Sequence, residues 1–480
     1  MITRLALLLA LMTSACGGAR PEALVTSESF DFGTLRRYGP GSTVLVTVQN
    51  LGSEPLEVAS IDVPDGVTAS PSAFTVEGAP GAVTVELTLD TAEAREVDGG
   101  LVLHTNDALT PDHEGPLTGE VTPYIRTALE EHPELDAYLE GEMASEQLVG
   151  VGAAVIRNQD IVYLRGFGFE DQEAARQVDP NATLFRWASV AKGVTALASM
   201  IAVEAGDLDL DEPVETYLSE YTPPSTYLAG CSDESCLTTL APTDRRVTMR
   251  RLLSHTAGMQ HYSNGLVDPV PPASITDDPA QNQGFAWALT YWTDAPLISV
   301  PGTRYAYSTF GFNLAGAVLE SAVASPFADY VHEHISEVLE MSSMRPDYAW
   351  VADRRRAVGY WRNSSGSIGR DADTDVSWKL PAGGYVSTVA DLARYCGGLM
   401  GDVVVPAARR DEMWTVQAPA ATYGLGFGVT EGQVSHTGAQ QKTRTALLVR
   451  RDEGLCFVFM TNATWADPGE LIGGMSEAWR

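Results

Sequence analysis

The chain has 480 residues, a hydrophobic fraction of 44% and a formal net charge of −32 at pH 7. The strong acidity argues against nucleic-acid binding, which depends on clusters of lysine and arginine. The length exceeds what one ordinary hydrophobic core spans, so two domains are expected.

The first residues have the pattern of an export signal. Arg4 precedes an apolar run over residues 5–12, and small residues then lead to Ala15. Cys16 follows at once, in an arrangement that resembles a bacterial lipoprotein processing site with Cys16 as the lipidated residue. An ordinary secretory signal cut near Ala15 is the alternative. We therefore predict a signal peptide over residues 1–15, a tether over 16–24, and an exported protein that is lipid-anchored at a bacterial cell membrane, on its periplasmic or outer-membrane face.

Short alternating segments fill residues 25–122. Apolar and polar residues alternate in runs such as 42–50 and 83–89, and Gly, Pro, Asn and Asp separate the runs. This spacing predicts an antiparallel β-sandwich. The phrases Asp31-Phe32-Gly33 and Thr105-Asn106-Asp107 resemble immunoglobulin-like modules of the hydin-related (ASH) type. This part carries no catalytic constellation, and the role expected for it is to bind a protein partner.

The remainder, residues 123–480, has an α/β pattern. A helix is expected over 125–142, followed by strands at 150–156 and 160–166 with a turn at residues 158–159. A second helix spans 189–206, and helices with long loops fill 215–345. Glycine-rich strand patterns return between 423 and 460. Strands at both ends of this region predict an antiparallel sheet, flanked by helices, that closes around an inserted helical subdomain.

Cysteine positions give two expectations. Cys231 and Cys236 flank a short polar loop, where an exported chain is expected to form a local disulfide. Cys396 and Cys456 lie in apolar segments and are expected to be buried free thiols.

The histidines do not indicate a metal site. No histidine pair accompanies the cysteines at the spacing of zinc ligands. His332 and His334 lie two apart on a predicted helix and so face different directions. His255, which follows two leucines and a serine, is expected to be structural. No metal or cofactor is predicted.

Ser189 and Lys192 lie three residues apart at the start of the second predicted helix, so their side chains share one face. A partly desolvated lysine with a lowered pKa can take the proton of a serine hydroxyl and so activate it. The free N–H groups of a helix N-terminus suit a developing oxyanion. Only three of the 31 basic residues are lysines. Because arginine cannot act as a base, a lysine here indicates a role that needs an amine.

Two further motifs follow in the chain. Tyr307, Ser308 and Thr309 lie within residues 301–313, and residues 435–439 read Ser-His-Thr-Gly-Ala on a predicted edge strand. Together with Ser-x-x-Lys, these motifs resemble the three active-site elements of serine β-lactamases and penicillin-binding proteins, in the right order. The resemblance runs from about residue 140 to 475. Within that superfamily it is nearest to the class C-related hydrolases, among them the mitochondrial serine β-lactamase-like type.

The resemblance implies a role for each matching residue. Ser189 would form the acyl-enzyme, and Lys192 and Tyr307 would share the proton transfers as general bases and acids. The backbone N–H groups of Ser189 and Ala439 would form the oxyanion hole.

The same resemblance places Thr309, His436, Thr437 and Gly438 against the substrate. Thr309 stands where asparagine is usual, and threonine lacks the two N–H donors of an amide. His436 replaces the usual lysine, and its charge would change near neutral pH. We therefore expect hydrolysis of peptide, amide or ester bonds rather than efficient β-lactam breakdown, and we expect turnover to depend on the ionisation of His436.

The predicted function is that of an exported serine hydrolase acting through an acyl-enzyme on a small-molecule or peptide substrate. The alternative is a catalytically weak or inactive penicillin-binding-like protein that serves as a binding module. The intact set of Ser189, Lys192 and Tyr307 favours the enzyme.

Overall fold

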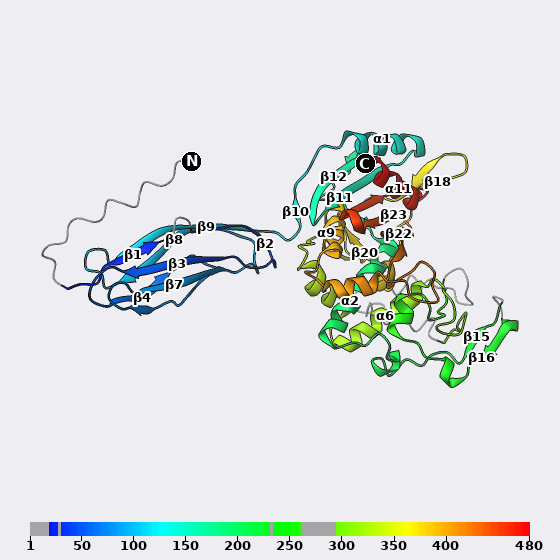
Figure 1. Cartoon of the computed structure of the whole chain (residues 1–480). Coiled ribbons are helices and arrows are strands. Elements are labelled where there is room, and N and C mark those ends of the chain that lie inside the picture. Colours follow the sequence, from blue (N-terminus) through cyan, green and yellow to red (C-terminus); the bar gives the residue numbers. More distant parts are fainter. Residues whose placement is uncertain (1–18, 27–29, 231–233, 262–293) are drawn as a thin grey trace. The chain divides into compact units, whose positions relative to one another are not determined.

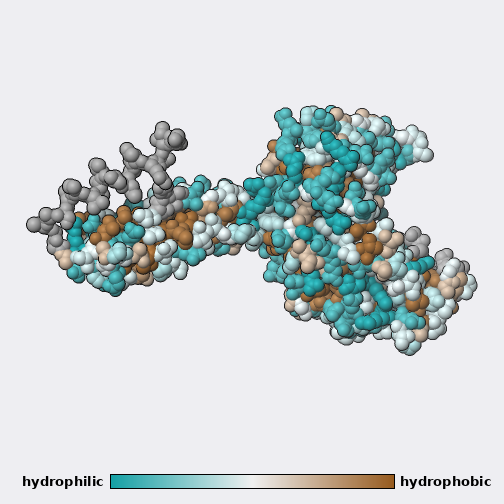
Figure 2. Space-filling model, viewed as in Figure 1, coloured by the Kyte–Doolittle hydropathy of each residue, from teal (hydrophilic) through white to brown (hydrophobic). Residues whose placement is uncertain are grey.

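The structure is a computed structural model that describes residues 19–26, 30–230, 234–261 and 294–480 (Figure 1). The predicted signal peptide and Cys16 lie outside the described residues. The chain divides into two compact units between Tyr124 and Ile125. The face shown in Figure 2 is largely hydrophilic, in keeping with the net charge of −32.

The first unit consists of two β-sheets. One has the strand order β1-β3-β7-β5 and the other β2-β9-β8-β4-β6. Alternate apolar side chains from both sheets, such as Val48, Leu87 and Leu103, form one buried core. The bounds of the strands are β1 Ala23–Thr26, β2 Phe30–Arg36, β3 Thr43–Asn50, β4 Leu56–Asp62, β5 Val67–Ser70, β6 Phe74–Val76, β7 Ala82–Leu89, β8 Arg95–Thr105 and β9 Asp112–Thr122.

Two details of this unit differ from the sequence prediction. Strand β1 begins at Ala23, inside the predicted tether. The expected all-antiparallel arrangement is wrong for one pair, because β2 runs parallel to β9. These two strands are far apart in the chain, so no hairpin turn constrains their relative direction.

The second unit is built on one sheet of order β10-β12-β11-β24-β23-β22-β21, with β13 paired to β12. Strand β11 pairs antiparallel with β24, so strands from the beginning and the end of the unit lie side by side, as predicted. The bounds are β10 Arg126–Thr127, β11 Gly150–Arg157, β12 Asp160–Asp171, β13 Arg176–Gln177, β21 Gly428–Thr430, β22 Gln433–Gln440, β23 Thr443–Arg450 and β24 Leu455–Thr461.

Helices cover both faces of this sheet (Figure 1). Helices α1 and α11 pack on the face that carries Phe457 and Phe459, and α9 packs on the opposite face, where Val389 lies against Gly152. The helices are α1 Pro133–Glu146, α2 Ala191–Ala205, α3 Met249–Leu253, α6 Thr309–Val323, α7 Phe327–Val331, α8 Leu380–Gly383, α9 Val389–Met400, α10 Ala407–Met413 and α11 Pro468–Ala478.

Short strands lie outside the main sheet. One small sheet has the order β14-β20-β17, and two hairpins are β15-β16 and β18-β19. The hairpin β15-β16 lies in the region predicted as helices and loops. The bounds are β14 Phe185–Arg186, β15 Thr226–Leu228, β16 Leu237–Thr239, β17 Arg345–Pro346, β18 Tyr360–Arg362, β19 Ile368–Arg370 and β20 Tyr385–Ser387.

The structure confirms the hairpin of β11 and β12 and corrects the helix before it. Asn158 and Gln159 both have positive φ, as a tight turn between right-twisted strands requires. The helix begins at Pro133 and not at residue 125, because Arg126 and Thr127 pair with β12 instead. Proline suits the first turn of a helix, where its missing N–H costs nothing.

The expectation of free thiols at Cys396 and Cys456 is wrong, because the two residues form a disulfide with a Cα–Cα distance of 6.3 Å. Cys396 lies on α9 and Cys456 on β24, on the face of the sheet that α9 covers. Their apolar surroundings therefore reflect the packing of a helix on a sheet. Cys236 is disulfide-bonded, and Cys231, its predicted partner, lies outside the described residues.

We expect the Cys396–Cys456 bond to contribute to stability, because it links positions 60 residues apart. Loss of a crosslink of this length lowers the free energy of unfolding by about 2–4 kcal/mol. Urea unfolding of the parent and of the Cys396→Ala/Cys456→Ala variant measures this difference. If the variant unfolds at the parent's urea midpoint, the bond does not stabilise the fold.

Candidate active site

Ser189 lies where a short strand meets a buried helix. Strand β14 leads into the 3-10 helix η1 (Ala188–Val190), which continues as α2. The Trp187 N–H donates to the carbonyl of Tyr385, and the indole N–H donates to Ser387 Oγ at 2.7 Å. These bonds attach the turn to β20. The stretch Ala188–Ala205 is apolar enough for a membrane span, but 72% of it is buried inside the protein, so it is a core helix.

Lys192 is one helical turn beyond Ser189 and is fully buried. Its Nζ lies 3.2 Å from Ser189 Oγ and 2.9 Å from the carbonyl oxygen of Ala382. Burial, and secondarily the charge of Lys379, lowers the pKa of Lys192 well below its ordinary value. A neutral amine can donate to the carbonyl of Ala382 and still accept the Ser189 proton.

Tyr307 lines the same cavity as Ser189. Lys192 Nζ is 4.9 Å from the centroid of the Tyr307 ring. Tyr307 lies just before α6, whose first turn is capped by Ser308 Oγ accepting from the Gly311 N–H at 2.9 Å. The structure therefore brings Tyr307 close to Ser189 and Lys192, which belong to a much earlier segment of the chain.

Ser189 and Tyr307 border a cavity of about 300 Å³ that we call the serine cavity. Its lining comes from five parts of the chain, which explains why no single segment of the sequence predicts it. It is lined by Ser189, His261, Tyr307, Thr309, Lys379, Ala382, Gly383, Thr437, Ala439 and Gln440.

Strand β22 forms one wall of the serine cavity. Strand β21 pairs with it only over Gln433–Ser435, so the later part of β22 can approach η1. A Cβ atom on Gly438 would lie 3.1 Å from the Ser189 nitrogen and 2.6 Å from the Trp187 carbonyl oxygen. Only glycine permits this approach without displacing the turn. Gly438 therefore shapes the site through its missing side chain.

The side chains of β22 point alternately to the two faces of the sheet, and this corrects the prediction that His436 lies against the substrate. Thr437 and Ala439 line the cavity, whereas His436 points to the other face and is buried. Its Nδ1 is 2.7 Å from the carbonyl oxygen of Thr437 and its Nε2 is 3.0 Å from the Tyr423 hydroxyl. Burial, then the charge of Lys192, lowers its pKa to about 3. His436 is therefore neutral near neutral pH and does not face the cavity.

Thr309 lines the cavity at the first turn of α6. Its N–H donates to His261 Nδ1 at 3.2 Å. Sequence reasoning missed His261, whose pKa burial lowers to about 4. It also missed Lys379, whose pKa burial lowers to about 8. The rarity of lysine in the chain was a signal for Lys379, but His261 carries no motif that identifies it.

A second cavity of about 640 Å³ adjoins the serine cavity and shares Lys379, Ala439 and Gln440 with it. Trp361 and Trp378 border it, so we call it the tryptophan cleft. Trp361 lines this cleft, whereas its neighbour Tyr360 is buried.

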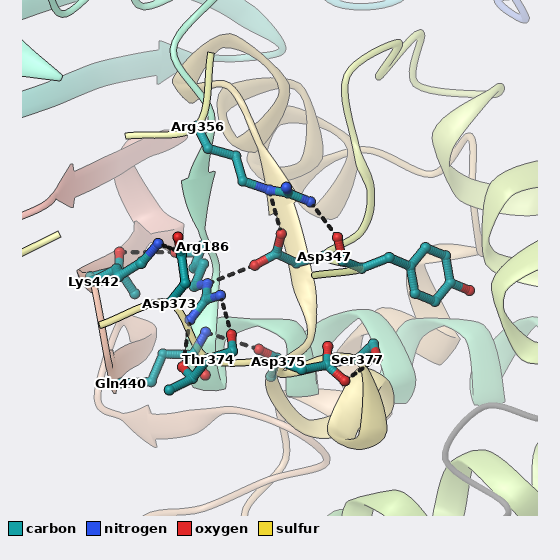
Figure 3. A network of polar contacts seen from close by, with 12 residues as sticks. Arg186, Asp347, Arg356, Asp373, Thr374, Asp375, Ser377, Gln440 and Lys442 are labelled. Carbon is teal, nitrogen blue, oxygen red and sulfur yellow. Dashed lines mark hydrogen bonds and ion pairs between the residues drawn. The ribbon is translucent and has the colours of Figure 1, made fainter. Parts of the chain in front are cut away.

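A polar network holds the loop that borders the tryptophan cleft (Figure 3). Arg186, in strand β14, pairs with Asp347 at 2.6 Å and donates to the Thr374 carbonyl at 2.6 Å. Asp347 also pairs with Arg356 at 2.7 Å. The backbone N–H of Lys442 donates to the Asp371 carboxylate at 3.0 Å. This network joins the wall of the cleft to the strand that leads to Ser189.

Two known proteins are similar to this chain in sequence. The esterase EstB of Burkholderia gladioli is 33% identical over 43% of this chain, which spans only about half of that enzyme (49%). The serine beta-lactamase-like protein LACTB, mitochondrial, of Mus musculus is 23% identical and covers 79% of this chain and 82% of its own.

Solved structures have the same fold. EstCE1, a hydrolase with promiscuous acyltransferase activity, superposes with a TM-score of 0.59 at 19% identity over 72% of this chain and 97% of its own. The octameric penicillin-binding protein homologue from Pyrococcus abyssi gives 0.58 at 23% identity, over 72% and 76%. The family model named Beta-lactamase matches residues 135–471. The chain therefore belongs to the beta-lactamase family.

Proposed function

We propose that this protein is a serine hydrolase that forms an acyl-enzyme on Ser189 and acts on ester, amide or peptide bonds. The observation that carries the proposal is the 3.2 Å distance between the buried amine of Lys192 and the Ser189 hydroxyl. A desolvated amine beside a serine in a cavity is typical of an activated nucleophile. A protein that only binds a partner has no need of this arrangement, so it favours the enzyme over an inactive binding module.

The chemistry follows from the positions of the three side chains. Lys192, whose pKa is lowered by burial, accepts the Ser189 proton in its neutral form as Oγ attacks the substrate carbonyl. The N–H groups of Ser189 and Ala439 stabilise the oxyanion, an interaction typically worth about 10²–10³-fold in rate per donor. Lys192 and Tyr307 then return the proton to the leaving group. Water attacks the acyl-enzyme by the same route and releases the acid.

Two residues of the site and one relative support esters, amides and peptides over β-lactams as substrates. Thr309 lacks the amide donors usual at its position, and the neutral, buried His436 provides no cation on β22. EstB, a relative over part of the chain, is named an esterase. The tryptophan cleft offers aromatic walls beside the serine cavity for a substrate substituent.

The remaining expectations belong to the same proposal. The Cys396–Cys456 disulfide supports export to an oxidising compartment, and lipidation at Cys16 would anchor the protein at a bacterial membrane. Class C-like character is inferred from the Tyr-Ser-Thr and His-Thr-Gly motifs. The first unit is proposed to be an immunoglobulin-like β-sandwich of the ASH type that binds a protein partner.

Ser189→Ala should abolish covalent labelling by a fluorophosphonate probe, because the variant lacks the hydroxyl that attacks phosphorus. The matched control is Ser199→Ala on the same helix, where a buried hydroxyl donates to the Thr195 carbonyl. Labelling resolved by gel fluorescence should be lost in the first variant and kept in the second. Undiminished labelling of Ser189→Ala would exclude Ser189 as the nucleophile.

His436 should not govern the pH dependence of the rate, contrary to the expectation from sequence. With a pKa of about 3, it stays neutral as the pH falls from about 8 to 5, the range in which exposed histidines become charged. We expect profiles of kcat/KM against pH for a p-nitrophenyl ester to have the same shape in the parent and in His436→Gln. An inflection near pH 6.5 in the parent that the variant lacks would contradict this.

The first unit should be dispensable for the chemistry, because every described residue lining the serine cavity lies beyond Ile125. A protein limited to residues 125–480 is expected to hydrolyse the same ester with a kcat within about threefold of the full chain, since it keeps all the groups that act in the transition state. A much larger loss would show that the first unit contributes to the site.

A further inference from the structure

His255 is buried beside the serine cavity and has an uncommon backbone conformation. It follows helix α3 with a φ of 58°, in the left-handed region, where a residue other than glycine is uncommon and strained. Only 2% of its surface is exposed. Such a conformation persists where the surrounding contacts hold it, so the contacts of His255 indicate what it does.

Those contacts lie on both sides of Tyr307. The N–H of Ala306 donates to the His255 carbonyl oxygen at 2.7 Å. The N–H of Ser308 donates to His255 Nδ1 at 3.1 Å. The rings of His255 and Tyr307 pack with their centroids 4.2 Å apart. One residue therefore holds the backbone before Tyr307, the backbone after it, and the ring itself.

The side-chain bond requires one protonation state. Nδ1 accepts a hydrogen bond only when the imidazole is neutral with its proton on Nε2. Burial, and next the charge of Lys192, lowers the pKa of His255 well below its ordinary value, so the ring stays neutral. Among the described residues, Nε2 has no hydrogen-bond partner, which is unfavourable for a buried donor. The fold thus tolerates a left-handed backbone and a buried N–H without a partner at the residue that holds Tyr307.

The same ring connects the Tyr307 segment to strand β22. It packs against Phe312 at 5.0 Å and against Tyr423 at 4.9 Å between ring centroids. The Tyr423 hydroxyl is 3.0 Å from His436 Nε2, on the inner face of β22. His255 therefore belongs to a packed cluster that reaches from one wall of the serine cavity to the other.

We propose that His255 is a positioning residue that holds the Tyr307 phenol in register with Lys192 and Ser189. It does not line the serine cavity, so it acts through Tyr307 and does not touch the substrate. The inference rests on the proposed function, because it assigns His255 a purpose only if Tyr307 transfers protons.

A double-mutant cycle tests this coupling. In the parent, His255→Leu should lower kcat for p-nitrophenyl acetate by roughly 100-fold, the effect expected of a misplaced catalytic group, with little change in KM. In the Tyr307→Phe background the same change should lower kcat by less than about threefold, because residues that act as a unit are not additive. Equal losses in both backgrounds would overturn the proposal.

A conservative variant provides an independent test that does not depend on leucine being tolerated. Asparagine accepts left-handed backbone and carries an amide oxygen that can replace Nδ1 as acceptor. His255→Asn should therefore keep kcat within about tenfold of the parent, a small part of the loss expected for a misplaced group. A loss of 100-fold in a folded His255→Asn protein would overturn the proposal.

The matched control is His334→Leu, which removes a histidine stacked on Tyr330 at 4.1 Å and away from the serine cavity. This variant should leave kcat unchanged. The failures of the two proposals are distinguishable. An unchanged rate in Ser189→Ala or Tyr307→Phe would overturn the proposed function and this inference together. If Ser189 and Tyr307 are both essential but the losses from His255→Leu and Tyr307→Phe are additive, only the role of His255 is overturned.

Discussion

The burial of one amine beside one hydroxyl is the constraint on which the rest of this structure depends. Lys192 is held without solvent, between Ser189 Oγ and the carbonyl oxygen of Ala382. Burial disfavours the charged form of this lysine and lowers its pKa, and the neutral form is the one that can accept a proton. The neighbouring Thr195 hydroxyl donates to the Pro381 carbonyl at 2.6 Å, which fixes α8 against α2 and holds the carbonyl that Lys192 contacts.

The other walls of the site depend on distant segments packing closely against the segment that carries Ser189. Strand β22 reaches the nucleophile turn because Gly438 has no side chain to collide with Trp187 and Ser189. The loop beside the tryptophan cleft is attached through Arg186 to the strand that precedes Ser189. Because Asp347 pairs with both Arg186 and Arg356, removing this carboxylate would leave two charged side chains without their shared partner.

The active-site geometry also explains why His436 has a different role from the one that the sequence suggested. In a strand, neighbouring side chains face opposite directions, so the residue before Thr437 is turned away from the cavity. His436 therefore supports the inner packing together with Tyr423. His255 was expected to be structural. Its contacts make that role specific, because they hold Tyr307 in place.

The sequence by itself determined the chemical groups of the site and the order of the motifs that carry them. Ser189 with Lys192, the Tyr307 motif and the Ser435–Ala439 segment are recognisable because their spacing is local, and the alternation of strands separates the first unit from the second. Only the tertiary structure decided that Cys396 and Cys456 are bonded, that His436 faces inward, and that His255 and His261 lie beside Tyr307. Each of these depends on contacts between segments far apart in the chain, and local periodicity carries no information about which distant segment will be the neighbour.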